Sequence, residues 1–234
     1  MGQSTTPGPL PPLDPPDARS AALAYIARGW APLPIPTRAK GPVSPKWQAL
    51  RITADQVDLY FPPGHPSNIG LLLGEPSGRL VDVDLDCGEA TILAPAILPP
   101  TGMIHGRESR PKSHYWYICS APPSSVARYT DACGGTIIEL RSTGGQTVVP
   151  PSVHPSGEQV VWDAAGAPAQ VEIEHLDRRV RLVAATVLLL RVGPTADQPG
   201  WPRFVDAVRD DLRAAGHTAE EIQLVISALA EVRS

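Results

Sequence analysis

The sequence lacks the features of secreted, disulfide-bonded and membrane-spanning proteins. Its 234 residues include only three cysteines, Cys87, Cys119 and Cys133, which are scattered and form no Cys-x-x-Cys spacing. This pattern fits a reducing compartment and gives no zinc signal. No apolar run approaches the ~20 residues that a membrane helix needs, and the first residues do not form a signal peptide. We therefore expect a soluble intracellular protein with no membrane contact.

The chain also lacks a net positive charge. Its 20 Lys and Arg are outnumbered by 24 Asp and Glu, which gives a formal net charge of −4. A basic surface over the whole molecule is thereby excluded, so any contact with nucleic acid has to be local.

Proline is present in excess, at 28 of 234 residues, against a usual share of about 5%. Six of these prolines fall in residues 1–16, which we expect to form a disordered leader. Residues 17–172 alternate short helices with strands and predict an α+β body. From residue 173 the apolar period changes from two to about 3.6. Residues 173–234 therefore predict a small C-terminal helical bundle, with helices over residues 178–191, 203–215 and 218–232.

Two pairs of predicted strands are separated by short turns rich in glycine. Residues 68–73 and 78–86 flank a Gly/Pro/Ser turn, and residues 136–141 and 146–149 flank the turn Ser142-Thr143-Gly144-Gly145. Strands joined by such turns commonly pair with each other. We therefore expect two β-hairpins.

Acidic and apolar residues alternate strictly in the strand at residues 78–86. The period of two places Leu80, Asp82, Asp84 and Asp86 on one face. Aspartate is a poor strand former, and three like charges on one face repel each other unless a cation neutralises them. Hard divalent ions such as Mg²⁺ and Mn²⁺ prefer carboxylate oxygens. A solvated strand face is the alternative, but three carboxylates in register at a strand end favour a metal site.

A basic loop precedes an aromatic strand at residues 113–118. The densest cluster of positive charge in the first 150 residues comprises Arg107, Arg110 and Lys112. His114 lies where this loop meets the strand, a position suited to contact a phosphate or to assist proton transfer. His105 and His154 are weaker candidates for the same roles.

A further carboxylate, Glu139, lies near the end of the strand at residues 136–141. The turn that follows contains Gly144 and Gly145. These glycines either serve only the turn, or they let backbone N–H groups and the guanidinium of Arg141 approach a triphosphate. Both interpretations stay open.

Residues 36–51 form a loop rich in glycine and proline. Its positively charged residues are Arg38, Lys40, Lys46 and Arg51, and it also contains Trp47. These cations are either solvated loop charges, with Trp47 plugging the core, or groups that face phosphate beside an aromatic platform. The local sequence favours the first interpretation.

Taken in order, three motifs resemble those of the bifunctional primase-polymerase (prim-pol) domains of phage and plasmid replication proteins, within the archaeo-eukaryotic primase superfamily. The first runs from Asn68-Ile69-Gly70 through Gly74–Gly78 into the acidic strand. The second is the basic loop that leads into Ser113–Tyr117, and the third is Ile138–Gln146 with Val149–Ser152. Each motif alone is weak, whereas the ordered set is specific. The resemblance covers residues 17–163, and Pro45-Lys46-Trp47 is similar to a recurrent feature of such domains.

The resemblance implies an RRM-like palm packed against an N-terminal α/β module, with residues 173–234 as a helical appendage. It also implies two divalent ions, Mg²⁺ or Mn²⁺, held by first-motif and third-motif carboxylates. Counting from Ser77-Gly78 assigns the first-motif pair to Asp84 and Asp86, with Asp82 as an additional candidate ligand. Glu139 stands where relatives often have aspartate.

His114 corresponds to the second-motif histidine, which meets the incoming nucleotide and completes the catalytic set. Relatives often have Ser-x-His in this motif, whereas Ser113 and His114 are adjacent here. The groups that we expect to bind the nucleotide are His114, Ser113, Arg107, Lys112, Arg141, Gly145 and, at a greater distance, Lys46.

The function implied is that of a DNA primase and DNA polymerase, a nucleotidyltransferase that adds dNTPs or NTPs on a single-stranded DNA template and primer. Such domains are usually fused to a helicase in a longer protein, and they act in the cytoplasm of a bacterial host cell. Two alternatives stay open. A metal-dependent nuclease uses the same carboxylates for hydrolysis, and a non-catalytic module binds nucleic acid without turnover.

Overall fold

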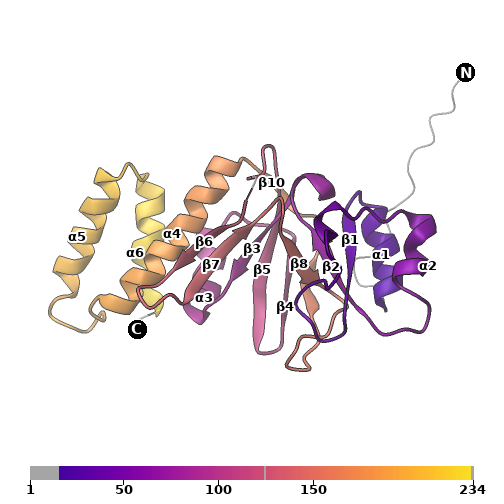
Figure 1. Cartoon of the computed structure of the whole chain (residues 1–234). Helices are drawn as coiled ribbons and strands as arrows, with labels where there is room; N and C mark the ends of the chain where they lie inside the picture. Colours follow the sequence, from indigo (N-terminus) through magenta and orange to yellow (C-terminus); the bar gives the residue numbers. More distant parts are fainter. Residues whose placement is uncertain (1–15, 124, 233–234) are drawn as a thin grey trace, which may run out of the picture.

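The structure of the chain, a computed structural model, describes residues 16–123 and 125–232 (Figure 1). The leader expected at residues 1–16 lies outside the described residues except for Pro16. The helices and strands are α1 (Ala18–Ile26), β1 (Ala31–Ile35), α2 (Val57–Tyr60), β2 (Asn68–Leu72), β3 (Leu80–Leu85), α3 (Gly88–Ile97), β4 (Met103–Arg107), β5 (Arg110–Cys119), β6 (Ala127–Thr130), β7 (Thr136–Arg141), β8 (Gln146–Val149), β9 (Val161–Ala165), β10 (Ala169–Val171), α4 (Ile173–Val192), α5 (Trp201–Ala214) and α6 (Ala219–Val232). The mixture of helices with antiparallel sheets confirms the α+β class.

The larger of two sheets has the strand order β6-β7-β3-β5-β4-β9, with β10 parallel to β5. The acidic strand β3 lies at its centre, antiparallel to both β7 and β5. Val81, Val83 and Leu85 are completely buried in the main core, as the alternation predicts. The residues between them therefore face the other side of the sheet. This order places the strands of the three motifs side by side.

Helices cover the core face of the larger sheet. Helices α3, α4 and α6 contribute side chains to the core that contains Val81 and Val83, and α5 lies against α6 at the end of the molecule farthest from β1 (Figure 1). Helix α4 begins at Ile173, earlier than the expected start at residue 178. Leu176 and Val180 in its first turns are completely buried, so packing on the sheet stabilises this early start.

The smaller sheet has the order β1-β2-β8 and is antiparallel. Strand β1 lies at its edge, which suits the two prolines that it contains. Helix α1 packs on this sheet and is capped by Asp17, whose carboxylate accepts a hydrogen bond from the Ser20 backbone N–H at 2.7 Å. A second core lies beneath it and includes Leu80 and Trp116 of the larger sheet. The two sheets therefore share a core.

Both expected β-hairpins are wrong. Strands β2 and β8 pair in the smaller sheet, whereas β3 and β7 pair in the larger one. Each glycine-rich turn carries the chain from one sheet to the other, and the two crossings meet at Gly74. A Cβ atom on Gly74 would lie only 2.6 Å from the Thr143 nitrogen, and Gly74 has φ of +73°. Glycine is therefore needed at this position both because its φ is positive and because the two crossings touch here.

Among the residues described, no helix combines the length and the apolar character needed to cross a membrane.

Candidate active site

Three carboxylates meet at the end of the central strand. Each of Asp84, Asp86 and Glu139 offers an oxygen atom, and these oxygens all lie within 4.8 Å of one another. The register explains their approach, because Asp84 on β3 is paired with Glu139 on β7. The backbone N–H of Asp86, just beyond β3, donates to the Ile137 carbonyl at 2.9 Å and fixes the third member. A set of three carboxylates suits a hard divalent cation such as Mg²⁺ or Mn²⁺.

Electrostatics make this cluster costly without a cation. Burial raises the pKa of Asp86 to about 6, and the negative charges of Asp84 and Glu139 add to the effect. Burial also acts to raise the pKa of Glu139, but its ion pairs with Arg141 and Arg128 outweigh burial and hold that pKa below its usual value. The carboxylates of Asp84 and Glu139 are thus matched by guanidinium groups, while Asp86 is less well compensated.

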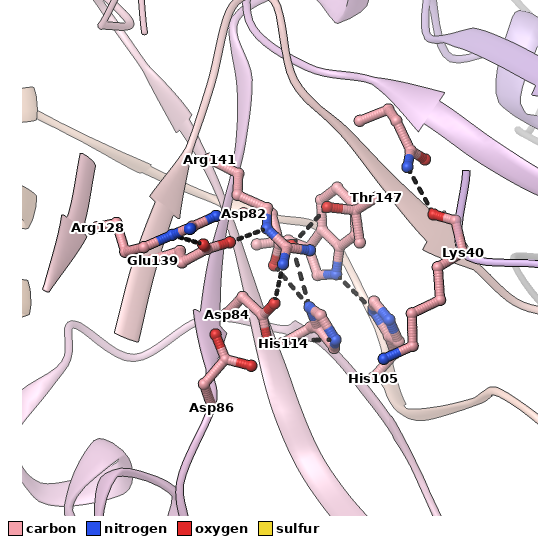
Figure 2. Close-up of polar contacts among 12 residues, drawn as sticks. Lys40, Asp82, Asp84, Asp86, His105, His114, Arg128, Glu139, Arg141 and Thr147 are labelled. Atoms are coloured by element: carbon pink, nitrogen blue, oxygen red, sulfur yellow. Dashed lines mark hydrogen bonds and ion pairs between the residues drawn. The ribbon is translucent and has the colours of Figure 1, made fainter. Parts of the chain in front are cut away.

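Two arginines bind the cluster from the side (Figure 2). Arg141 Nε lies 2.7 Å from Glu139 Oε2, and its Nη2 forms an ion pair with Asp84 Oδ2. Arg128 Nε forms an ion pair with Glu139 Oε1. Sequence reasoning missed Arg128, which lies on the short strand β6 directly opposite Glu139. Strand β6 is only four residues long and contains no motif, so little in the sequence indicated that Arg128 belongs to the site.

Asp82 has surroundings different from those expected of a metal ligand. It is completely buried, it lies outside the three-carboxylate cluster, and it accepts a hydrogen bond from Thr147 Oγ1 at 2.6 Å. The same oxygen, Oδ2, lies 3.0 Å from His114 Nδ1 and 4.0 Å from Arg141 Nη1. The local geometry makes Asp82 a partner of His114.

His114 lies between Asp82 and the metal-binding candidates, since its Nε2 is 3.5 Å from Asp84 Oδ1. Burial lowers the pKa of His114, but the charges of Asp84 and Asp82 outweigh burial and raise the pKa above its usual value. The ring also stacks on His105, with parallel planes and centroids 4.2 Å apart. His105 accepts a hydrogen bond from Trp116 Nε1 at 2.8 Å, and its burial lowers its own pKa well below the usual value.

A cavity of about 420 Å³ opens beside these groups. It is lined by all three cluster carboxylates and by His114. The positively charged side chains that line it are Lys40, Arg107, Arg110, Arg128 and Arg141, and Gly145 and His154 also border it. A cavity of this size, acidic on one side and basic around its rim, suits a small phosphorylated ligand held with a cation.

Several expected nucleotide-binding residues lie elsewhere. Lys46 and Lys112 do not line the cavity, whereas Lys40 and Arg110, which were not expected to bind the nucleotide, do line it. Lys112 is exposed, and its backbone N–H donates to Asp163 on β9. Arg110 Nη1 instead lies 3.9 Å from Asp86 Oδ1.

Ser113 and Arg107 border the cavity but in ways that the sequence did not indicate. Adjacent residues on a strand face opposite sides, so Ser113 shares the face of Tyr115 and Tyr117 and points away from the ring of His114. Its hydroxyl is buried and has no hydrogen-bond partner among the described residues. Arg107 lines the cavity while forming an ion pair with Glu158 at 3.1 Å.

The comparisons with known proteins agree with this geometry. The family model described as bifunctional DNA primase/polymerase, N-terminal, matches residues 22–176. No curated protein and no solved structure matches the chain. The matched range contains every charged side chain that lines the cavity and extends into α4. Because this match covers well over half of the sequence, the chain belongs to the bifunctional DNA primase/polymerase family.

Proposed function

We propose that this protein is a primase and DNA polymerase that performs template-directed nucleotidyl transfer of dNTPs or NTPs on single-stranded DNA, with two divalent ions. The single observation that carries the proposal is the convergence of Asp84, Asp86 and Glu139, with oxygens within 4.8 Å of one another, at the wall of a cavity rimmed by arginines. Phosphoryl transfer needs positioning and charge neutralisation more than covalent help from the protein.

The donor set fits Mg²⁺ or Mn²⁺, because all three groups are carboxylates. The pKa of Asp86 is raised by burial first and by the charge of Asp84 second, so a bound cation would favour its ionised form. Asp84, Asp86 and Glu139 would hold the ions. The chemistry that bound ions would supply is activation of the primer 3′-hydroxyl and stabilisation of the departing pyrophosphate.

The arginines supply the other half of the site. Arg141 and Arg128 share Glu139 as an ion-pair partner, and Arg141 also contacts Asp84. Arg128 and Arg141 would be released from these carboxylates in part if a cation were held there, and their guanidinium groups could then bind the triphosphate. Arginine is suited to this exchange because its planar group matches phosphate and carboxylate equally well.

His114 supplies a second, fixed donor. Its Nδ1 faces Asp82, so the other ring nitrogen, Nε2, is directed toward Asp84 and the cavity. The charges of Asp84 and Asp82 raise the pKa of His114 against the effect of burial and so favour the doubly protonated ring, in which Nε2 would donate to a phosphate oxygen of the incoming nucleotide.

The family resemblance also suggests which parts of the chain form the catalytic domain and in which process it acts. We infer that the larger sheet with α3 is the RRM-like palm and that the smaller sheet with α1 is the N-terminal module. Residues 17–172 then form the catalytic unit, with α5 and α6 as part of the appendage. Phage or plasmid replication, together with a helicase in the same polypeptide, is the setting that we propose.

A primer-extension assay tests the function. With a labelled primer on a single-stranded template, dNTPs and Mg²⁺ or Mn²⁺, we expect the wild-type protein to lengthen the primer. Asp84→Asn with Asp86→Asn removes two of three ligands and should lower incorporation by about 10³-fold or more. Asp210→Asn with Asp211→Asn, on α5, removes the same charge and should leave incorporation unchanged. A shortened primer would indicate a nuclease, and DNA binding without any product would indicate a non-catalytic module.

A further inference from the structure

The loop at residues 36–51 carries positive charge that the proposed active site does not use. From Ala18 to Ala54 the sequence contains six Lys and Arg and no Asp or Glu, in a chain whose net charge is −4. The four cations of the loop are Arg38, Lys40, Lys46 and Arg51, and all four are exposed. None of them forms an ion pair with another residue in the described part of the chain.

The backbone of this loop is fixed on the smaller sheet. Gln146 Nε2, on β8, donates to the Lys40 carbonyl at 2.8 Å, and Asn68 Nδ2, on β2, donates to the Ala39 carbonyl at 3.3 Å. The partly buried Trp47 packs against a small cluster that includes Leu33. Trp47 therefore anchors the loop, and the loop presents its cations at defined positions.

Two of these cations have unusual backbone conformations. Arg38 and Lys46 adopt φ of 60° and 59°, in the left-handed region that residues other than Gly, Asn and Asp seldom occupy. Such conformations persist where the surrounding structure imposes them, and they are frequent at binding sites. The anchored carbonyls of Ala39 and Lys40 directly follow Arg38, and the packed side chain of Trp47 directly follows Lys46.

The loop reaches the mouth of the cavity. Lys40 lines it, on the side of the site opposite Arg128 in the view of Figure 2. Arg38 Nη2 lies 3.7 Å from the position that a Cβ atom on Gly157 would take. The N–H of Gly157 donates to the carbonyl of His154, a residue that lines the same cavity.

The positive charge at the cavity mouth affects the pKa of His154, which also lines the cavity. Burial lowers the pKa of His154, and the nearby charges of Arg107 and Lys40 lower it further. Lys40 of the loop therefore lies at the same cavity as Arg107 and Arg110 of the hairpin between β4 and β5.

We propose that loop 36–51 binds the phosphate backbone of the single-stranded nucleic acid that enters the active site, with Lys40 at the cavity mouth and Arg38 and Lys46 along the path outside it. Exposed cations spaced along a fixed loop suit a chain of phosphates, which is bound through charge and without regard to sequence. A single triphosphate would occupy only the cavity, where Arg128 and Arg141 already lie. This inference rests on the proposed function, because that function makes the bound strand a template or primer. Binding of the strand can nevertheless be measured without catalytic turnover.

The test compares two double variants of the full chain. Arg38→Gln with Lys46→Gln removes two loop cations that lie outside the cavity, and Arg203→Gln with Arg213→Gln removes two exposed cations from α5, at the other end of the molecule (Figure 1). Binding of a fluorescein-labelled single-stranded oligonucleotide is followed by anisotropy at several salt concentrations. Nucleotide affinity is measured separately with a fluorescent dNTP analogue and Mn²⁺, and the thermal midpoint of each variant reports folding.

We expect the loop variant to bind DNA about tenfold more weakly than the wild type at low salt, and its salt slope to fall by about 0.7 for each phosphate that the loop no longer neutralises. Its dNTP affinity and thermal midpoint should match the wild type, and the α5 variant should retain DNA binding. Unchanged DNA affinity and slope in the loop variant would overturn the proposal, as would an equal loss in the α5 variant. Weaker dNTP binding with intact DNA binding would assign the loop to the triphosphate instead. Absence of primer extension by the wild type, with these binding results intact, would reject the polymerase and leave the strand-binding loop standing.

Discussion

The imidazole rings of His105 and His114 lie parallel, with centroids 4.2 Å apart. Trp116 Nε1 donates to His105 Nδ1, so this nitrogen carries no proton and His105 is the neutral partner of the stack. A neutral ring can lie flat against a protonated His114 without charge repulsion. The stack therefore fixes the plane of His114, while Asp82 fixes which of its nitrogens faces the cavity.

Replacing His105 should separate these effects. His105→Phe keeps a flat ring against His114 but leaves the buried Trp116 N–H without an acceptor, which costs about 1–3 kcal/mol of unfolding free energy. We expect kcat for primer extension to stay within a few-fold of the wild type. His105→Ala also removes the stack and should lower kcat by about tenfold or more, because small displacements of catalytic groups are costly. Equal kcat values for the two variants would show that the stack does not position His114.

Asp82→Asn should lower the pKa of His114, because it removes one of the two negative charges that raise it against burial. A histidine whose pKa is raised by folding contributes stability at low pH, and this contribution disappears as pH rises through its folded-state pKa. Asp82→Asn should therefore destabilise the metal-free protein more at pH 5 than at pH 9. NMR titration of His114 and urea unfolding at both pH values measure these effects. An unchanged His114 pKa would contradict the assigned contact.

The raised pKa of Asp86 also makes stability fall as pH rises, here because burial disfavours the charged carboxylate. With a pKa of about 6 in the folded protein and about 3.9 when unfolded, this carboxyl is protonated more readily in the fold, so stability falls as pH rises between these values. After discounting for its partial exposure, we expect Asp86→Asn to stabilise the metal-free protein by about 1 kcal/mol at pH 7 and to have no effect below pH 4. Urea unfolding in the presence of a chelator measures this difference. Saturating Mn²⁺ should reverse the sign at pH 7, since the variant loses a ligand.

Arg141→Gln should change metal and nucleotide affinity in opposite directions. Arg141 is paired with Asp84 and Glu139, the same carboxylates that are proposed to hold the ions. Removing its charge frees these carboxylates, so Mn²⁺ alone should bind more tightly. Binding of dNTP in the presence of Mn²⁺ should weaken by about tenfold or more, since a charged hydrogen bond is worth about 1.5–3 kcal/mol. Electron paramagnetic resonance counts free Mn²⁺, and a fluorescent dNTP reports the second affinity. If the variant lost affinity for both Mn²⁺ and dNTP, Arg141 would have a structural role in holding the site together and would not bind the nucleotide directly.

The meeting of Asp84, Asp86, Glu139 and His114 was expected from the resemblance to the prim-pol motifs, and alternation in the acidic strand supported it for the aspartates. Strict alternation determines which side of β3 the aspartates face, and the order of the motifs indicates which strands belong together. The α+β class follows from the same change of period along the chain.

The remaining features depend on contacts between distant segments. A glycine-rich turn has the same composition whether the chain folds back or crosses to another sheet, so the pairing of β2 with β8 could not be read from the turns. Arg128 has a role only because β6 pairs with β7, and His105 only because it lies between Trp116 and His114. Lys40 and Lys46 are equivalent by sequence pattern, and only the anchored backbone of the loop places Lys40 at the cavity.

The most direct measurement is the anomalous scattering of Mn²⁺ in crystals of this protein with a non-hydrolysable dNTP. We expect manganese within about 2.5 Å of oxygens from Asp84, Asp86 and Glu139, and a triphosphate whose oxygens contact Arg128, Arg141 and His114. Manganese bound elsewhere, or a nucleotide outside this cavity, would contradict the proposed active site.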